Sequence, residues 1–168
     1  MAVGTQWYAI RTRSRHEKVV AERLGMQGIE TFLPLVSRLH RWSDRRKQVQ
    51  LPLFPGYAFV RVVPSLQEHS RVLRTFGVVN FVGTRWNDSA IPDEQIRDIR
   101  VLLDQNVPLS DHTFIKLGQR VRVRGGALDG VEGILCAHNE DRSLIITVEA
   151  VQRSISIRIE GYDVEVLR

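Results

Sequence analysis

Several short segments in the last third of the chain alternate apolar with polar residues. Alternation occurs at Val121 and Val123, over 144–148 and over 155–159, and this is the pattern of half-buried β-strands. Turn-forming residues such as Gly125-Gly126 separate the segments, and no stretch beyond residue 116 shows a convincing helical period. Short strands in so small a segment protect their edges best by closing on themselves. We therefore expect a small β-barrel over residues 117–168.

The first hundred residues show mixed signals instead. Strand patterns and helix patterns follow one another in the order strand, helix, strand, strand, helix, strand, with a further helix at the end. The expected strands are 6–12, 30–39, 53–62 and 78–82, and the expected helices begin after Ser14, at 66 and at Pro92. This order is that of a split βαβ unit, so we predict an α+β domain whose antiparallel sheet is flanked by helices. We place it at 1–106, with a linker over 107–116.

Local signals place the ends of these elements. Ser14 and Glu17 have the spacing of a capping box, and Gly28 is suited to end the helix that follows. Pro34 indicates an edge or a bulge in the second strand. Ser65 is a suitable N-cap for the second helix. The core stripe of the third helix is expected to be Ile96, Ile99 and Leu103.

Positive charge is concentrated at the start of the chain. The net charge is +5, and the first fifty residues hold 10 Lys and Arg against 4 Asp and Glu. Such asymmetry favours contact with a polyanion, although a solvated surface has the same composition. From Val107 onward, 8 basic residues face 9 acidic ones. The expected barrel is therefore nearly neutral.

Composition excludes several classes of protein. No stretch approaches the roughly 20 apolar residues that a membrane-spanning helix needs, and the charged N-terminus lacks a secretory apolar run. Cys136 is the only cysteine, so there is no internal disulfide framework and a cytoplasmic location is expected. Its apolar neighbours suggest a thiol packed in the core.

Motifs of catalysis are missing as well. The glycines between Gly125 and Gly133 are not followed by Gly-Lys-Ser/Thr, so they do not form a phosphate loop. The five histidines lack metal-ligand spacing, and there is no Gly-x-Ser-x-Gly elbow. We expect no enzymatic activity, no metal and no cofactor.

The segment Phe54-Pro55-Gly56-Tyr57 predicts a sharp corner. Gly56 allows the backbone to turn, and Pro55 stiffens the approach. The corner would place Phe54 and Tyr57 close together, with Trp7 on a neighbouring strand. These rings either form an apolar pocket for the tip of a partner helix or fill the core of the domain.

Two motifs resemble the NusG family of transcription factors. Trp7-Tyr8 and the segment 54–57 resemble its N-terminal (NGN) domain, and residues 121–133 (VRVRGGALDGVEG) resemble its SH3-like KOW β-barrel. The resemblance implies a transcription elongation factor that modulates pausing, termination or antitermination by binding the clamp helices of the largest RNA polymerase subunit. The positions implied in polymerase binding are Trp7, Phe54, Pro55, Tyr57, Phe59 and Phe81.

The resemblance also assigns roles to the basic residues and to the barrel. Those implied in contact with the non-template DNA strand or with the upstream duplex are Arg11, Arg13, Lys18, Arg23, Arg41, Trp42, Arg45, Arg46 and Lys47. At the tip of the KOW motif, Leu128 is expected to be an exposed apolar contact for a partner such as termination factor Rho or a small-subunit ribosomal protein.

Three functional interpretations remain open. The amino-acid sequence of the second half resembles that of specialised paralogues that antiterminate long polysaccharide operons, and we favour such a factor. The alternative within the family is the general housekeeping factor. A ribosomal-type RNA-binding module is the third interpretation, but it would need a basic barrel, whereas this barrel is nearly neutral.

Overall fold

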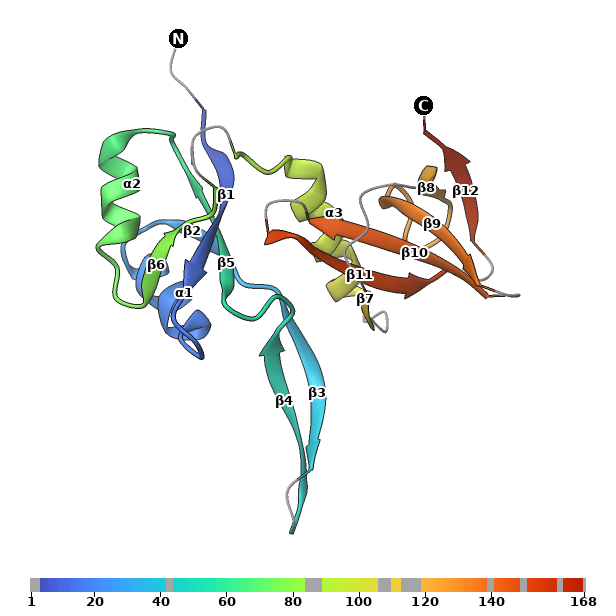
Figure 1. Ribbon diagram of the computed structural model, residues 1–168, viewed down its shortest axis with the longest axis horizontal. Coiled ribbons are helices and arrows are strands. Elements are labelled where there is room, and N and C mark those ends of the chain that lie inside the picture. Colours follow the sequence, from blue (N-terminus) through green and yellow to red (C-terminus); the bar gives the residue numbers. More distant parts are fainter. Residues whose placement is uncertain are drawn as a thin grey trace. The chain divides into compact units, whose positions relative to one another are not determined.

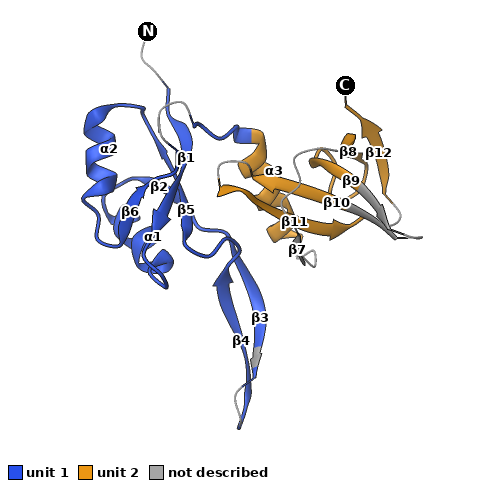
Figure 2. Ribbon diagram, in the orientation of Figure 1, with its two compact units in different colours: residues 1–93 blue, residues 94–168 orange. Residues whose placement is uncertain are grey.

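The computed structural model describes residues 4–41, 44–83, 89–105, 110–112, 119–138, 141–148, 151–159 and 162–167. The chain divides into two compact units, unit 1 (Met1–Asp93) and unit 2 (Glu94–Arg168), shown in Figure 2. The boundary falls at the first residue of the third helix, whereas the sequence predicted the end of the first domain at residue 106.

Unit 1 is built on a four-stranded antiparallel sheet. Its strands lie in the order β2-β5-β1-β6, which is the order of the predicted split βαβ unit. Two helices connect them (Figure 1). The elements are β1 (Gln6–Thr12), α1 (Glu17–Met26), β2 (Glu30–Phe32), β5 (Tyr57–Val62), α2 (Leu66–Leu73) and β6 (Val78–Phe81).

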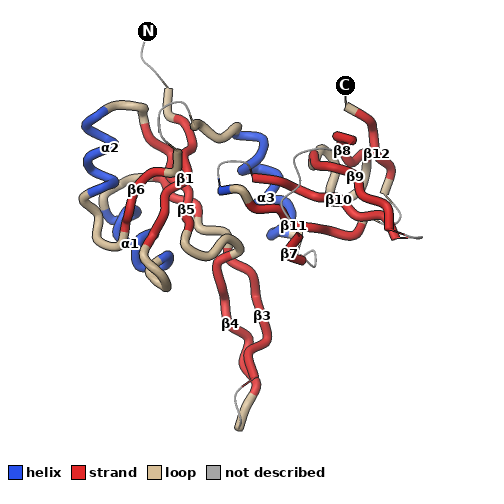
Figure 3. The backbone as a smooth tube through the Cα atoms, in the orientation of Figure 1, coloured by secondary structure: helices blue, strands red, loops and turns tan. Residues whose placement is uncertain are grey.

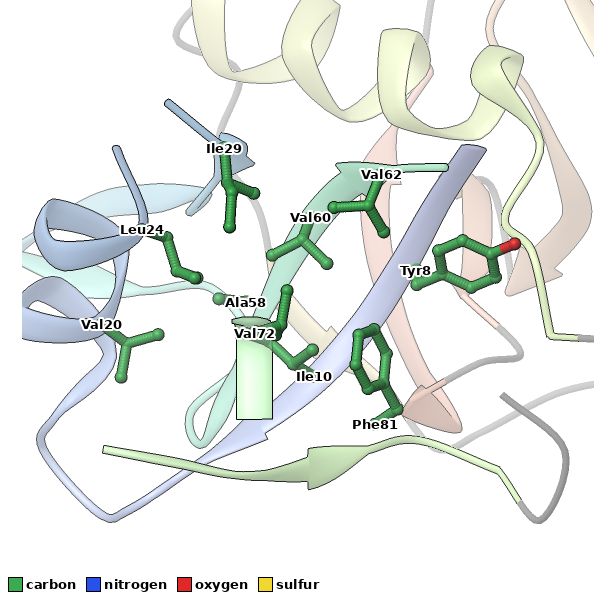
Figure 4. Close-up of a cluster of buried hydrophobic side chains, with 10 residues drawn as sticks. All are labelled: Tyr8, Ile10, Val20, Leu24, Ile29, Ala58, Val60, Val62, Val72 and Phe81. Atoms are coloured by element: carbon green, nitrogen blue, oxygen red, sulfur yellow. The ribbon is translucent and has the colours of Figure 1, made fainter. Parts of the chain in front are cut away.

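The hydrophobic core of unit 1 lies between the sheet and these helices. Alternate residues of β1 and β5 point toward α1 and α2, as Figure 4 shows for Ile10 and Val60. Val20 and Leu24 of α1 and Val72 of α2 meet them, each with 0% exposure. Removing this apolar surface from water is the main driving force for the fold of the unit.

The ends of the helices only partly follow the predictions. Ser65 caps α2 as expected, because its hydroxyl accepts a hydrogen bond from the Glu68 amide at 3.2 Å. Gly28 ends α1 as expected, and the amide of Ile29 donates to the Leu24 carbonyl at 3.0 Å. The capping box was wrong. His16 is the N-cap of α1, without a side-chain cap, and the Glu17 carboxylate accepts from a distant amide instead.

The predicted strand over 30–39 breaks at Pro34. Residues before it form β2 in the main sheet, and residues after it form β3 (Leu35–Arg41), which pairs only with β4 (Arg46–Pro52). Proline cannot donate to a strand ladder, so an interruption at this position is expected. The pair forms a two-stranded ribbon that extends away from the sheet of unit 1 (Figure 3).

Unit 2 contains a six-stranded antiparallel sheet in the order β12-β8-β9-β10-β11-β7. The alternating segments predicted to be strands are strands, and their apolar residues, such as Val121 and Leu144, are buried. The expected linker contains β7, which pairs with β11. The elements are α3 (Asp93–Asp104), β7 (Ser110–His112), β8 (Gln119–Arg124), β9 (Glu132–His138), β10 (Asp141–Val148), β11 (Arg153–Arg158) and β12 (Asp163–Val166).

Helix α3 is joined to the strands of unit 2 by two polar contacts. The Gln95 side-chain amide donates to the Thr147 carbonyl at 2.7 Å, and the Glu132 amide donates to the Asp98 carboxylate at 3.1 Å. These contacts join α3 to the strands of unit 2, in agreement with a boundary at the first residue of the helix. The buried stripe of the helix includes Leu102, whereas Leu103, which the sequence assigned to it, is half-buried.

In the part of the chain that the structure describes, no helix is long and apolar enough to cross a membrane.

Candidate functional site

The segment Phe54–Tyr57 forms a tight turn that leads into β5. The Tyr57 amide donates to the Phe54 carbonyl at 3.1 Å, and Gly56 has a φ of 86°. With Pro55 at the second position and a left-handed glycine at the third, this is the pattern of a type II β-turn. The predicted sharp corner is therefore confirmed.

Two hydrogen bonds hold the Gly56 residue from outside the turn. Its amide donates to Oε1 of Glu17 at 2.9 Å, and its carbonyl accepts from the Thr12 amide at 2.8 Å. Glu17 is 6% exposed, so its carboxylate is buried in the first turn of α1. No local pattern indicates this contact, because 39 residues separate the two partners.

A row of aromatic rings lies on the sheet face opposite α1 and α2. The β1–β5 pairing places Ala9 beside Phe59, and the β2–β5 pairing places Phe32 beside Phe59. Ring centroids are 6.5 Å apart for Trp7 and Phe32, 6.1 Å for Phe32 and Phe59, and 6.0 Å for Phe54 and Phe59. The structure thus brings three predicted rings together through Phe32. Sequence reasoning missed Phe32, because no motif marks it.

Most of these rings are buried. Trp7 and Phe54 are each 2% exposed and Phe59 is 0% exposed, so they do not line the open pocket that one of the two interpretations required. Pro55 is exposed and Tyr57 is half-buried. The turn residues are therefore the more accessible part of this region, and the buried rings lie beneath them.

Phe81 does not belong to this row. It pairs with Ile10 across β6 and β1, and it belongs to the core cluster on the side of the helices (Figure 4). Its ring lies 6.1 Å from that of Tyr8 and 4.6 Å from that of His69. Strand alternation points its ring to the face opposite the aromatic row, and a polymerase contact at Phe81 stays a prediction.

Two arginines, one before α1 and one in its last turn, gather at an exposed aromatic ring. Phe76 is 50% exposed, and the guanidinium carbons of Arg13 and Arg23 lie 5.5 Å and 5.2 Å from its ring centroid. These are cation–π distances. The His16 ring also contacts Phe76, at 5.7 Å. Arg11 and Lys18 are also exposed, and we call the set of Arg13, Arg23 and Phe76 the α1 basic surface.

A second basic group lies toward the end of the ribbon. Arg41 and Arg46 pair with each other across β3 and β4. Arg45 and Lys47 are also exposed. Four like charges on so narrow a ribbon repel one another, so the arrangement is suited to an anionic partner. Trp42, predicted to stack on bases, lies outside the described residues.

Leu128 is buried, contrary to the expectation of an exposed tip. It is 1% exposed. The loop is closed by hydrogen bonds from the Gly125 amide to the Asp129 carboxylate at 2.7 Å and from the Val131 amide to the Leu128 carbonyl at 3.1 Å. Leu128 is the large apolar side chain of this loop, and burying it gains about 1.5–3 kcal/mol. The residues next to it, Ala127 and Asp129, are the exposed ones.

Among the described residues, no three His, Cys, Asp or Glu side chains gather where they would bind a metal ion.

Comparisons with known proteins match these features. Residues 5–100 match the family model described as "Transcription termination factor nusG". Proteins named transcription termination/antitermination protein NusG are similar along most of their length. The one from Lactococcus lactis is 27% identical over 95% of this chain and 91% of its own. The one from Streptococcus pyogenes is 30% identical over 76% of this chain and 77% of its own.

A solved structure of Thermotoga maritima NusG has the same fold. It aligns with 98% of this chain and 98% of its own, with a TM-score of 0.55 and 20% sequence identity. The family match continues past residue 93 into α3, so the matched segment crosses the boundary between the two units.

Proposed function

Because the chain belongs to the NusG family of transcription termination and antitermination factors, we propose that it binds RNA polymerase through the Phe54–Tyr57 turn and alters pausing or termination. The binding partner is the pair of clamp helices of the largest subunit, which the family resemblance implies. The turn is suited to this role because hydrogen bonds fix its backbone. Pro55 and Tyr57 are accessible to a partner, whereas Phe54 is buried beneath them.

The observation that carries the proposal is the position of Tyr57. It is half-buried at the edge of the aromatic row, next to exposed Pro55, while Phe54 and Phe59 are buried behind it. Interface residues that contribute most to affinity are often aromatic side chains held by a rigid surround. A rigid turn also limits the conformational entropy that is lost when a partner binds.

We further propose that the α1 basic surface and the ribbon contact the non-template DNA strand. Arginines supply phosphate contacts whose strength falls as salt rises. An exposed ring such as Phe76 stacks on unpaired bases and contributes about 1–3 kcal/mol per base. Arg13 and Arg23 lie close enough to Phe76 to bind the flanking phosphates.

Two single substitutions separate these contacts. Tyr57→Ala is expected to weaken binding to core polymerase by about 2 kcal/mol, near thirtyfold, and Phe76→Ala is expected to leave that affinity unchanged. In a complete elongation complex, Phe76→Ala should instead reduce crosslinking to the non-template strand. Both are aromatic residues of unit 1 with partial exposure, so each serves as the control for the other. Equal polymerase affinity for Tyr57→Ala and the wild type would contradict the proposal.

Within the family, we propose that the chain is a specialised factor that acts on selected operons. The proposal is based on the amino-acid sequence of residues 115–135 (IKLGQRVRVRGGALDGVEGIL). The general factor, which couples polymerase to Rho or to a ribosome through its KOW domain, is the second candidate, favoured by the names of the curated relatives. Chromatin immunoprecipitation distinguishes them. Occupancy confined to a few operons supports the specialised factor, and occupancy that follows polymerase on most genes supports the general one.

A further inference from the structure

Glu17 is a buried carboxylate without an ion-pair partner among the described residues. It is 6% exposed and lies in the first turn of α1, yet none of the salt bridges between described residues includes it. Burying a charged carboxylate costs free energy unless hydrogen bonds replace its water. Some favourable interaction must therefore offset the cost of burying the Glu17 carboxylate.

Capping of α1 does not supply that reason. An acidic residue in the first turn of a helix is favoured by the helix dipole, but it gains this benefit while exposed to solvent. The Glu17 side chain does not bond to Ser14, and the N-cap His16 has no side-chain cap. The contact that the structure does show for Glu17 is the one with the Gly56 amide, at 2.9 Å.

The space beside Gly56 has room for a side chain, so crowding at this position is not what holds its backbone. A Cβ atom built on Gly56 would meet no other atom within 4 Å, so the surroundings leave open space at this residue. Three hydrogen bonds hold the backbone here. The Gly56 amide donates to Oε1 of Glu17 at 2.9 Å, the Gly56 carbonyl accepts from the Thr12 amide at 2.8 Å, and the Tyr57 amide closes the turn on the Phe54 carbonyl at 3.1 Å. The bond to Glu17 involves a charged acceptor and is the stronger kind.

We infer that Glu17 is a positioning residue, which holds the Phe54–Tyr57 turn in the conformation that presents Tyr57 to polymerase. Without the carboxylate, the Gly56 amide loses its acceptor, and the glycine regains access to other backbone conformations. Tyr57 follows Gly56 directly, so its ring then samples several orientations. Part of the binding free energy is lost in ordering it again. This inference rests on the proposed function for its consequence in binding, but not for the contact itself.

The test compares three variants of the full-length chain. Glu17→Ala removes the acceptor, whereas Glu17→Gln keeps a side-chain oxygen at the same reach. Leu24→Ala is the control, because it also destabilises unit 1 from α1, but it lies in the core cluster rather than at the turn. Each variant is assayed for affinity to core polymerase and, without polymerase, for exchange of the Gly56 amide proton by NMR.

Glu17→Ala removes one hydrogen bond to a charged group, so we expect it to weaken polymerase binding about tenfold or more. Exchange of the Gly56 amide proton should become faster to a similar extent. Glu17→Gln should restore most of both. Leu24→Ala should lower thermal stability while it leaves polymerase affinity near that of the wild type.

The outcomes distinguish the positioning role of Glu17 from the proposed binding to polymerase. If Glu17→Ala matches the wild type in affinity, or if Leu24→Ala loses affinity equally, Glu17 does not position the turn for binding. If the wild-type chain fails to bind polymerase, the proposed function is overturned. In that case, slow Gly56 exchange in the wild type and fast exchange in Glu17→Ala would still establish that Glu17 holds the turn, and equal exchange would overturn that as well.

Discussion

Replacing Asp98 by asparagine is expected to stabilise unit 2 at neutral pH. The Asp98 side chain is 7% exposed, and its burial raises the pKa of the carboxyl from 3.8 to about 6. The hydrogen bond from the Glu132 amide and the charge of Arg97 lower this pKa, whereas the charges of Glu132 and Glu94 raise it. Burial outweighs the rest, so the folded unit prefers the protonated form.

The direction of the pH effect follows from this preference. Because the pKa of Asp98 is higher in the folded chain than in the unfolded one, its contribution is fully present below about pH 4 and is lost as pH rises through about 6. A shift of roughly two units corresponds to about 3 kcal/mol as an upper limit. Asparagine keeps an oxygen that accepts from the Glu132 amide but carries no charge, so the variant should not show this loss.

The assay is urea unfolding of the full-length chain at about pH 4.5 and about pH 7.5, with α3 followed by amide hydrogen exchange. Asp98→Asn should unfold at higher urea than the wild type near pH 7.5, and the difference should shrink toward pH 4.5. Asp104→Asn, an exposed position in the same helix, is the control and should change stability by less than about 0.5 kcal/mol. A less stable Asp98→Asn at neutral pH would refute the reasoning.

Three further outcomes are expected. Gly133→Ala should destabilise unit 2 by about 1–3 kcal/mol in urea unfolding, because its Cβ would lie 2.5 Å from the Ile145 carbonyl oxygen. Leu128→Asp should cost about 3 kcal/mol or more, since a buried leucine is lost and a carboxylate is buried; a fully stable variant would show that the side chain is exposed in solution. Reversing Arg45, Arg46 and Lys47 to glutamate should reduce crosslinking to the non-template strand and its dependence on salt; equal crosslinking would return the ribbon to the role of a solvated surface.

Signals that act over a few residues were readable from the sequence. Ser65 lies three residues from the amide that it caps, and the Phe54–Tyr57 turn is specified by its own proline and glycine. The alternating residues over 144–148 needed only the strand period to predict their burial. The order of the elements in unit 1 followed from the same kind of signal.

Contacts between distant segments were not readable. Glu17 has the right spacing for a capping box, but its carboxylate bonds to an amide 39 residues away. Phe81 and Phe59 are both aromatic residues of strands, and only the register of the sheet separates the faces on which they lie. Helix α3 follows unit 1 in sequence, yet Asp98 bonds to a residue 34 positions later. In each case a tertiary partner decided the outcome, and no local pattern encodes that partner.

The most direct test of the proposed function is site-specific photocrosslinking in a reconstituted elongation complex. A photoreactive phenylalanine derivative is introduced in place of Tyr57 in one sample and in place of Phe76 in another, and the crosslinked partner is identified by mass spectrometry. We predict that position 57 crosslinks to the clamp helices of the largest polymerase subunit, and that position 76 crosslinks to the non-template DNA strand. Absence of the largest subunit among the partners of position 57, in a complex that still forms, would contradict the account.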